Sequence, residues 1–150
     1  MAELTIFLIA MSPIVELRGA IPVALGVYNL PVWSAFLIAV LGNLVPALLI
    51  PFYGKGSALL SSRFAVFERF ITWLFERSRR RHGKAFETFK SFALITLVAI
   101  PLPFTGVWTA SLAAFVFGIP FKKAFLLISV GVIIAAVIVT LLSLGILSIV

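Results

Sequence analysis

The chain has 150 residues, of which 63% are hydrophobic and 11% are charged, and its net charge is +7. A soluble domain of this length needs more polar residues to cover its surface, so we expect a single all-α integral membrane domain. There is no cysteine, and the one histidine, His82, lies in a basic run. We therefore expect no metal site, no cofactor and no cysteine chemistry.

The first predicted element is a hairpin over residues 4–28. Its two apolar runs, 4–11 and 21–28, are too short to cross a hydrocarbon core of ~30 Å, which takes about 20 helical residues. The sequence SPIVELRGAIP at 12–22 joins them, and its prolines and glycine disfavour helix. Broken backbone at membrane depth is tolerated only inside protein or beside a cavity, so we expect a re-entrant hairpin with an irregular tip.

Two charged side chains, Glu16 and Arg18, lie within this apolar hairpin. A charge at the centre of a bilayer costs about 2.5–3.5 kcal/mol on insertion scales, so such residues mark a functional site by default. The alternative is a structural pair. In an extended tip, side chains two residues apart lie on the same side and can neutralise each other.

The first segment long enough to cross the membrane is predicted at 30–52. Its centre carries Gly42 and Asn43, followed by Pro46, which cannot donate a hydrogen bond to the carbonyl of Gly42. This pattern predicts either a kink packed against a neighbouring helix or part of a polar pathway, and kinks at proline are the commoner case.

The segment 54–90 is the hydrophilic part of the chain, and nine of the twelve Lys and Arg residues lie between 55 and 90. Apolar residues recur in it at helical spacing, which predicts a basic amphipathic helix on the membrane surface, in contact with anionic lipids. By the positive-inside rule this segment is cytoplasmic. That explanation accounts for the charge without nucleic acid, which we do not expect as a partner.

A second hairpin is predicted at 91–118, with a tip of sequence PLPFTG at 101–106, and a second span at 124–150. Small residues recur at Gly131 and Ala135, which favours close helix packing.

The domain then divides into repeat one (1–53), the cytoplasmic segment and repeat two (91–150). A hairpin returns to its starting face and a span crosses, so the two repeats have opposite orientations, as in secondary transporters. We expect a multi-pass protein of the cytoplasmic (inner) cell membrane, with both termini outside. Two spans for each protomer indicate at least a homodimer.

Three motifs resemble the small multi-drug export protein family: SPIVELRGAIP at 12–22, Gly42-Asn43 with Pro46, and PLPFTGVWTA at 101–110. That family is similar, more distantly, to the DedA / SNARE-associated (VTT) superfamily. The superfamily resemblance implies two opposed re-entrant hairpins and ion-coupled translocation of a polyprenyl (undecaprenyl) phosphate carrier lipid. Glu16 matches the acidic residue of the first hairpin tip, whereas 101–118 carries no charge where that pattern has arginines.

The main functional hypothesis is translocation of such a lipid phosphate. The guanidinium of Arg18 suits phosphate, and half-helix N-termini near Gly19 and near residues 105–107 would aim unpaired N–H groups at the same place. Burial favours the neutral form of a carboxyl, so protonation of Glu16 could couple transport to a proton gradient. The predicted substrate-binding residues are Glu16, Arg18, Gly19, Asn43, Thr105, Gly106, Trp108 and Thr109.

Two other functions stay open. The first is proton-coupled export of small lipophilic cations with Glu16 as the binding carboxylate, although Arg18 would repel such a cargo. The second is a non-transporting membrane scaffold. We do not expect an enzyme, because no nucleophile–base or metal-ligand pattern is present.

Overall fold

The computed structural model describes residues 1–51, 69, 73, 88–100 and 106–149 of the chain. These residues form helices and no strand. The helices are α1 (Ala2–Met11), α2 (Glu16–Gly26), α3 (Val32–Leu48), a helix at Thr88–Ala99 called the 88–99 helix, α5 (Val107–Val116) and α6 (Phe121–Leu147). The all-α prediction is confirmed for this part of the chain. Most of the predicted amphipathic segment 54–90, and Thr105 of the predicted site, lie outside it.

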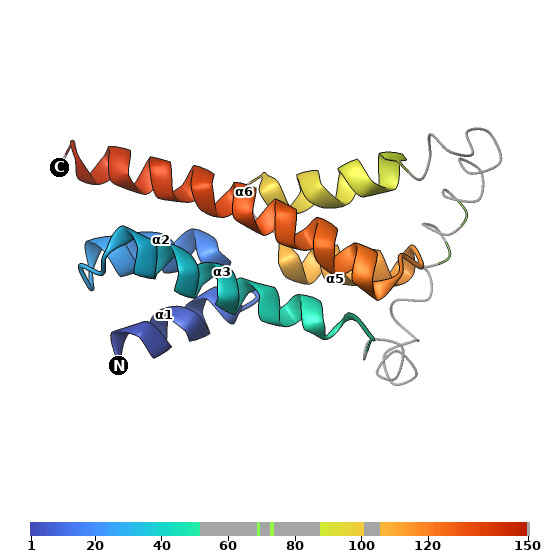
Figure 1. Cartoon of the computed structure of the whole chain (residues 1–150), viewed down its shortest axis with the longest axis horizontal. Coiled ribbons are helices and arrows are strands. Elements are labelled where there is room, and N and C mark those ends of the chain that lie inside the picture. The colour runs from blue at the N-terminus through green and yellow to red at the C-terminus, as the bar shows by residue number, and fades with distance from the viewer. Residues whose placement is uncertain (52–68, 70–72, 74–87, 101–105, 150) are drawn as a thin grey trace.

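The helices form an elongated bundle with α6 along its length (Figure 1). The hairpin of α1 and α2 occupies the end that carries both termini, and the 88–99 helix and α5 lie toward the other end. The long helix α3 packs against α1, α2, α5 and α6, and α6 also packs against α2 and α5. The two long helices therefore hold the four short ones together.

Of the described helices, α6 with 27 residues is the one that is long and apolar enough to cross a membrane. The predicted second span at 124–150 begins three residues earlier, at Phe121, because Pro120 caps this helix in an extended conformation. Within the predicted span 30–52, α3 has 17 residues, about 26 Å at 1.5 Å per residue. It runs through Pro46 and ends at Leu48, where the N–H of Leu49 closes a tight turn onto the carbonyl of Pro46 at 3.0 Å.

The first hairpin differs from the expectation at its tip. The predicted irregular stretch 12–22 is confined to 12–15, and α2 begins at Glu16 and runs through Gly19 and Pro22. The extended tip, on which the alternative of a structural pair of Glu16 and Arg18 was based, is therefore wrong, because both residues lie in α2. Packing outweighs the local helix-breaking tendency, because α2 buries an apolar face against its neighbours that includes Leu17 and Ile21.

Two glycines let a short helix approach a long one. A Cβ on Gly42 of α3 would lie 2.6 Å from the carbonyl oxygen of Phe7 in α1. A Cβ on Gly131 of α6 would lie 2.7 Å from the Cβ of Val98 and 3.0 Å from the carbonyl oxygen of Ile95, both in the 88–99 helix. In each case the first helix of a hairpin packs against a glycine of the long helix that follows that hairpin.

The connections into the two long helices are also alike. Asn29 has a φ of 49° and is followed by Pro31, the N-cap of α3, with φ −55° and ψ 141°. Gly118 has a φ of 64° and is followed by Pro120, the N-cap of α6, with φ −55° and ψ 140°. Asn and Gly are the residues that tolerate this left-handed conformation best. Both long helices are thus entered through a left-handed residue and a proline cap.

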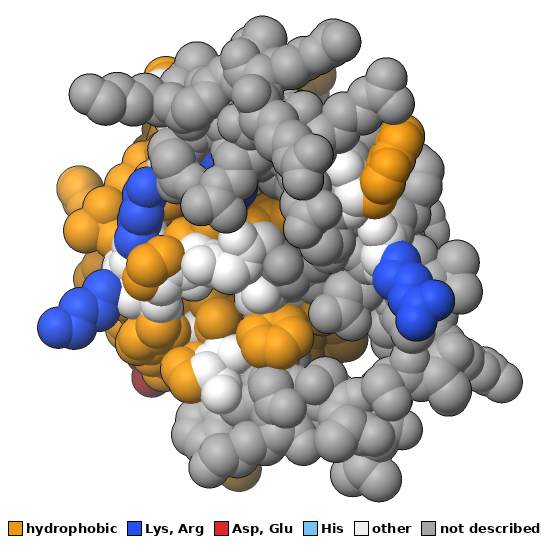
Figure 2. All heavy atoms as spheres, turned by 90° about the vertical axis from the view of Figure 1, so that its right-hand side faces the viewer, with side chains coloured by type: hydrophobic (Ala, Val, Ile, Leu, Met, Phe, Trp, Pro, Cys, Tyr) orange, Lys and Arg blue, Asp and Glu red, His pale blue; other side chains and the backbone are white. Residues whose placement is uncertain are grey.

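The described lysines lie toward one end of the bundle (Figure 2). Lys122 and Lys123 lie in the first turn of α6, and Lys90 lies near the start of the 88–99 helix, where its Nζ contacts the carbonyl oxygen of Phe117 at 3.5 Å. The opposite end, with both termini, exposes the aromatic side chain of Trp33, which is 77% accessible.

We predict that Gly131→Ala destabilises the protein by about 1–3 kcal/mol, because overpacking a tight contact forces the helices apart. Gly145→Ala in the same helix is the matched control, since a Cβ there meets nothing within 4 Å. Denaturant unfolding in detergent micelles measures both changes. Equal stability of the two variants would contradict the close approach at Gly131.

Candidate functional site

The candidate site lies where four helix ends meet at the centre of the bundle. The C-terminus of α1 and the N-terminus of α2 belong to the first hairpin. The C-terminus of the 88–99 helix and the N-terminus of α5 belong to the second. A helix end leaves up to four backbone N–H or C=O groups without an intrahelical partner, and in apolar surroundings each must find one. The hydrogen bonds between the two hairpins satisfy several of these groups.

Glu16 satisfies the N-terminus of α5. Its side chain is 6% exposed, and its carboxylate accepts hydrogen bonds from the backbone N–H groups of Val107 and Trp108. A carboxylate at this position is also favoured by the positive end of the helix dipole. Because α5 belongs to the second hairpin and Glu16 to the first, this contact joins the two halves of the chain.

The approach of the carboxylate requires Gly106, the N-cap of α5. A Cβ at this position would overlap both carboxylate oxygens of Glu16. Glu16 itself has a φ of 53°, in the left-handed region, which costs a non-glycine residue of order 1–3 kcal/mol. The strain at Glu16 is maintained by the contacts that its side chain makes with α5.

Two side chains contact the C-terminal carbonyl groups. The indole Nε1 of Trp108 donates to the carbonyl oxygen of Met11, the last residue of α1, at 3.1 Å. The Nη2 of Arg18 donates to the carbonyl oxygen of Ile100, next to the end of the 88–99 helix, at 3.4 Å. A cation near a helix C-terminus is favoured by the helix dipole. Each hairpin thus supplies a side chain that caps the other.

The structure brings four of the predicted site residues together: Glu16, Arg18, Gly106 and Trp108. Gly19 lies one turn further along α2, where an added Cβ would overlap the side chain of Val15, the N-cap of this helix, so its small size serves the local packing. Thr109 is exposed on α5. The predicted half-helix N-terminus near Gly19 lies at Glu16, whereas the one near 105–107 is confirmed at Val107.

Asn43 is 2% exposed in α3, and its Oδ1 has no hydrogen-bond partner among the described residues. Gly42 beside it packs tightly against α1. Two residues of this region were not predicted from the sequence, Met11 and Ser111. The backbone carbonyl of Met11 has no sequence signal, because it lies in an apolar run. Ser111, which is buried one turn into α5, could have been noticed as a polar residue among small apolar ones.

The site combines one buried carboxylate, one guanidinium and two helix N-termini. The described residues contain no group of three His, Asp or Glu side chains that could hold a metal ion. The carboxylate of Glu16 can bind or release a cation such as a proton at the contact between the hairpins. A change of charge on Glu16 changes the strength of the hydrogen bonds that cap α5.

Helix α6 is long and apolar enough to cross a membrane, and many large apolar side chains are exposed on the bundle, as in a membrane protein. The family described as "Putative small multi-drug export protein" matches residues 16–138, and the chain belongs to this family. The match begins at Glu16 and extends into α6. No curated protein matches the chain. No solved structure matches it either.

We predict that Gly106→Ala lowers the free energy of unfolding by about 1–3 kcal/mol, because the added methyl group displaces the Glu16 carboxylate from α5. In a Glu16→Ala background the same change should cost less, with a coupling of about 0.5–3 kcal/mol in the double-mutant cycle. Denaturant unfolding of the four proteins measures it. Additive effects would show that the two residues do not interact.

We also predict that Trp108→Phe costs about 0.5–1.5 kcal/mol of stability, the usual net contribution of one hydrogen bond. The change keeps an aromatic ring and removes the N–H that caps Met11. Trp33→Phe, on a side chain that is 77% exposed, is the matched control. If both variants unfold at the same denaturant concentration, the indole hydrogen bond contributes nothing.

Proposed function

We propose that the protein exports small lipophilic cations in exchange for protons, with Glu16 as the group that carries the exchange. The observation behind this proposal is the buried carboxylate of Glu16 at the contact between the two hairpins. The name of the family, small multi-drug export protein, supports the same function. A lipophilic cation and a proton would compete for one carboxylate, so binding of either excludes the other.

The mechanism follows from the capping of α5. When Glu16 is ionised, the N–H groups of Val107 and Trp108 hold it and the hairpins are joined. A proton or a cationic cargo on the carboxylate weakens these hydrogen bonds, since a charged acceptor binds about twice as strongly as a neutral one. The hairpins can then separate on one side, and alternation between the two arrangements would move the cargo.

Arg18 is the objection to a cationic cargo, because its guanidinium lies near Glu16 and repels a second cation. Its Nη2 contacts the carbonyl oxygen of Ile100, so its position also serves to cap the 88–99 helix. Arg18 therefore stabilises the structure and also repels a cationic cargo. Its replacement should affect a cation exporter and a lipid-phosphate carrier differently.

Ion-coupled translocation of a lipid phosphate is the second candidate, and one observation favours it. The N-terminus of α5 holds an anionic group, the Glu16 carboxylate, with Arg18 beside it. A phosphate headgroup could replace that carboxylate after protonation of Glu16. Similarity to the DedA / SNARE-associated superfamily would fit this cargo. In the structure, however, the groups expected to bind phosphate are in contact with other parts of the chain.

For the topology we propose two re-entrant hairpins in inverted repeats of a multi-pass inner-membrane protein, which functions as a homodimer. The proposal is supported by the shared plan of the two halves: a glycine contact in each long helix and a proline cap before it. The described lysines lie at one end, which would be cytoplasmic, and both termini lie at the other, outside.

The experiment is transport into proteoliposomes with two cargoes, ethidium as a lipophilic cation and a fluorescent polyprenyl phosphate. We expect proton-driven ethidium transport in the wild type and its loss in Glu16→Gln, because the amide takes up no proton. Glu3→Gln, at an exposed position in the first turn of α1, is the matched control and should transport normally.

Arg18→Ala decides between the candidates. A cation exporter should keep or increase ethidium transport, because the repelling charge is gone, whereas a lipid-phosphate carrier should lose its activity. Lys122→Ala controls for the loss of a positive charge elsewhere. Transport of the polyprenyl phosphate alone, abolished by Arg18→Ala, would overturn the cation proposal, and absence of both activities in folded protein would favour the scaffold.

A further inference from the structure

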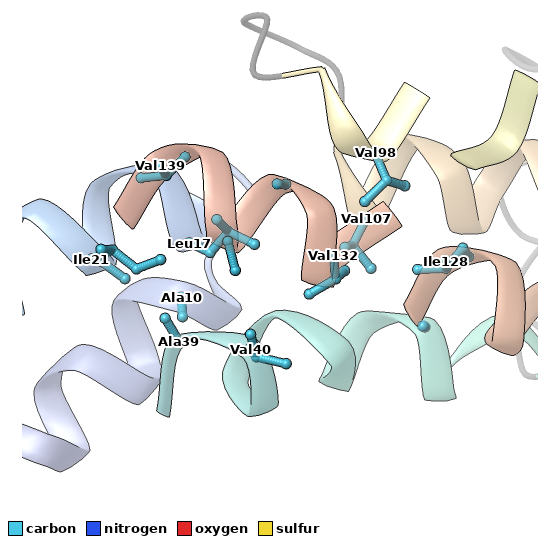
Figure 3. Packing of buried hydrophobic residues seen from close by; sticks show 14 of the residues in the cluster. Ala10, Leu17, Ile21, Ala39, Val40, Val98, Val107, Ile128, Val132 and Val139 are labelled. Carbon is cyan, nitrogen blue, oxygen red and sulfur yellow. The ribbon is translucent and has the colours of Figure 1, made fainter. Parts of the chain in front are cut away.

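The two long helices bury corresponding positions. Pro31 is the N-cap of α3, and Pro120, 89 residues later, is the N-cap of α6. At this same spacing, each buried residue of α3 except Val40 has a buried counterpart in α6; these residues are Ala35, Ala39, Gly42, Asn43, Pro46 and Ala47. Ala39 and its counterpart Ile128 belong to one hydrophobic cluster (Figure 3). The two halves of the chain therefore share one packing register along their long helices.

The second helices of the two hairpins, α2 and α5, agree in one stripe of buried residues. At the same spacing, the positions that are buried in both helices are Leu17, Ile21 and Leu25 in α2 and Gly106, Ala110 and Ala114 in α5. Successive members are four residues apart, so they lie along one face of each helix. This stripe faces the interior of the bundle in both halves.

The residues on the two sides of this stripe differ between the helices. In α2, Ala20 is buried and Pro22 is exposed. In α5 the order is reversed. Thr109, the counterpart of Ala20, is exposed, and Ser111, the counterpart of Pro22, is buried. With 3.6 residues in each turn, the buried face of α5 is rotated by roughly 60° about the helix axis relative to that of α2.

The first helices of the hairpins also differ in the face that they present. A Cβ on Gly42 of α3 would lie 2.9 Å from the Cβ of Ala10 in α1. A Cβ on Gly131, the counterpart of Gly42, would lie 2.7 Å from the Cβ of Val98, which corresponds to Ile9 rather than to Ala10. The 88–99 helix thus makes this contact one residue earlier than α1 and turns a different face to its long helix. Each hairpin has its own rotation against long helices of the same register.

The side chains of α5 are compatible with either rotation. The Ser111 side chain is 0% exposed and its hydroxyl has no hydrogen-bond partner among the described residues, which costs free energy in the observed rotation. On the other side of the stripe α5 has the small side chains of Thr109 and Ala113. A threonine buried in a helix can donate to the carbonyl one turn earlier. Rotation of α5 to the face that α2 presents would therefore bury Thr109 and expose the Ser111 hydroxyl.

We propose that α5 rotates between these two faces during transport, and that the Glu16 carboxylate holds it in the observed rotation. The N–H groups of Val107 and Trp108, in the first turn of α5, donate to this carboxylate. Rotation of that turn about the helix axis breaks these hydrogen bonds. A proton or a cation on Glu16 weakens them, because a charged acceptor binds about twice as strongly as a neutral one. The inference rests on the proposed function, in which Glu16 exchanges a proton for a cationic cargo.

Few charged groups accompany Glu16 on the described helices. Arg18 lies on the same helix and favours the ionised carboxylate, and so the observed rotation. Helices α3 and α5 carry no charged side chain. Those of the remaining helices lie in or near the first turn: Glu3 in α1, Lys90 in the 88–99 helix, and Lys122 and Lys123 in α6. The charge of Glu16 therefore acts on α5 through the two N–H groups that donate to it.

The test is electron paramagnetic resonance of a nitroxide spin label on the protein in proteoliposomes. The chain has no cysteine, so Thr109→Cys provides one attachment site, at an exposed position of α5. The label is mobile in the observed rotation, and rotation of α5 immobilises it inside the bundle. We expect the immobile component to rise from at most about 10% of the signal to the larger part of it, both on addition of ethidium and in Glu16→Gln. The ethidium condition retains the native Glu16, so the test does not depend on the folding of Glu16→Gln.

Two further variants make the readout specific. Ser111→Ala removes the hydroxyl that lacks a partner in the observed rotation, so it should reduce the immobile component in the presence of ethidium. Leu126→Cys is the matched control for the label, because Leu126 of α6 is 63% exposed and its counterpart in α3, Leu37, is 54% exposed. The label at this position should stay mobile in every condition.

The outcomes separate this inference from the proposed function. Unchanged mobility of the Thr109→Cys label in both conditions, in protein that transports ethidium, would overturn the rotation and leave the proposed function intact. An immobile component in Glu16→Gln, in protein that neither transports ethidium nor responds to it, would support the rotation and overturn cation export.

Discussion

The contact between the Glu16 carboxylate and the N-terminus of α5 is the constraint on which the rest of the structure depends. Short helices that end inside an apolar bundle expose backbone groups that neither lipid nor apolar side chains can satisfy. Glu16 provides the acceptor for one such end. The absence of a side chain at Gly106 and the left-handed backbone of Glu16 both follow from bringing that carboxylate into place.

The other contacts at the site follow the same logic. Trp108 and Arg18 donate to carbonyl groups at the ends of α1 and the 88–99 helix. Residues that look like a binding site in the sequence therefore also have structural partners. A transport function requires that these partners be exchanged during the cycle, which is why the charge of Glu16, rather than a rearrangement of the core, is the natural control point.

Much of this arrangement was predictable from the sequence. Length and proline positions identify the two short apolar pairs and the long helix α6, and membrane energetics identify Glu16 and Arg18. The prediction of an extended tip was wrong, and the chain is helical from Glu16 onward. Tertiary packing of Leu17 and Ile21 outweighs the helix-breaking tendency of Gly19 and Pro22. The partners of Glu16 were not predictable as particular atoms, since backbone N–H and C=O groups carry no sequence signal and are brought together only by the fold.

The reciprocal capping has a consequence for biosynthesis. The hydrogen bond from Trp108 to Met11 spans 97 residues, and that from Arg18 to Ile100 spans 82. While the ribosome is still making the middle of the chain, α1 and α2 have left it without the partners that their ends will have in the finished protein. The ends of the first hairpin therefore lack these two hydrogen bonds until the second half of the chain has been synthesised.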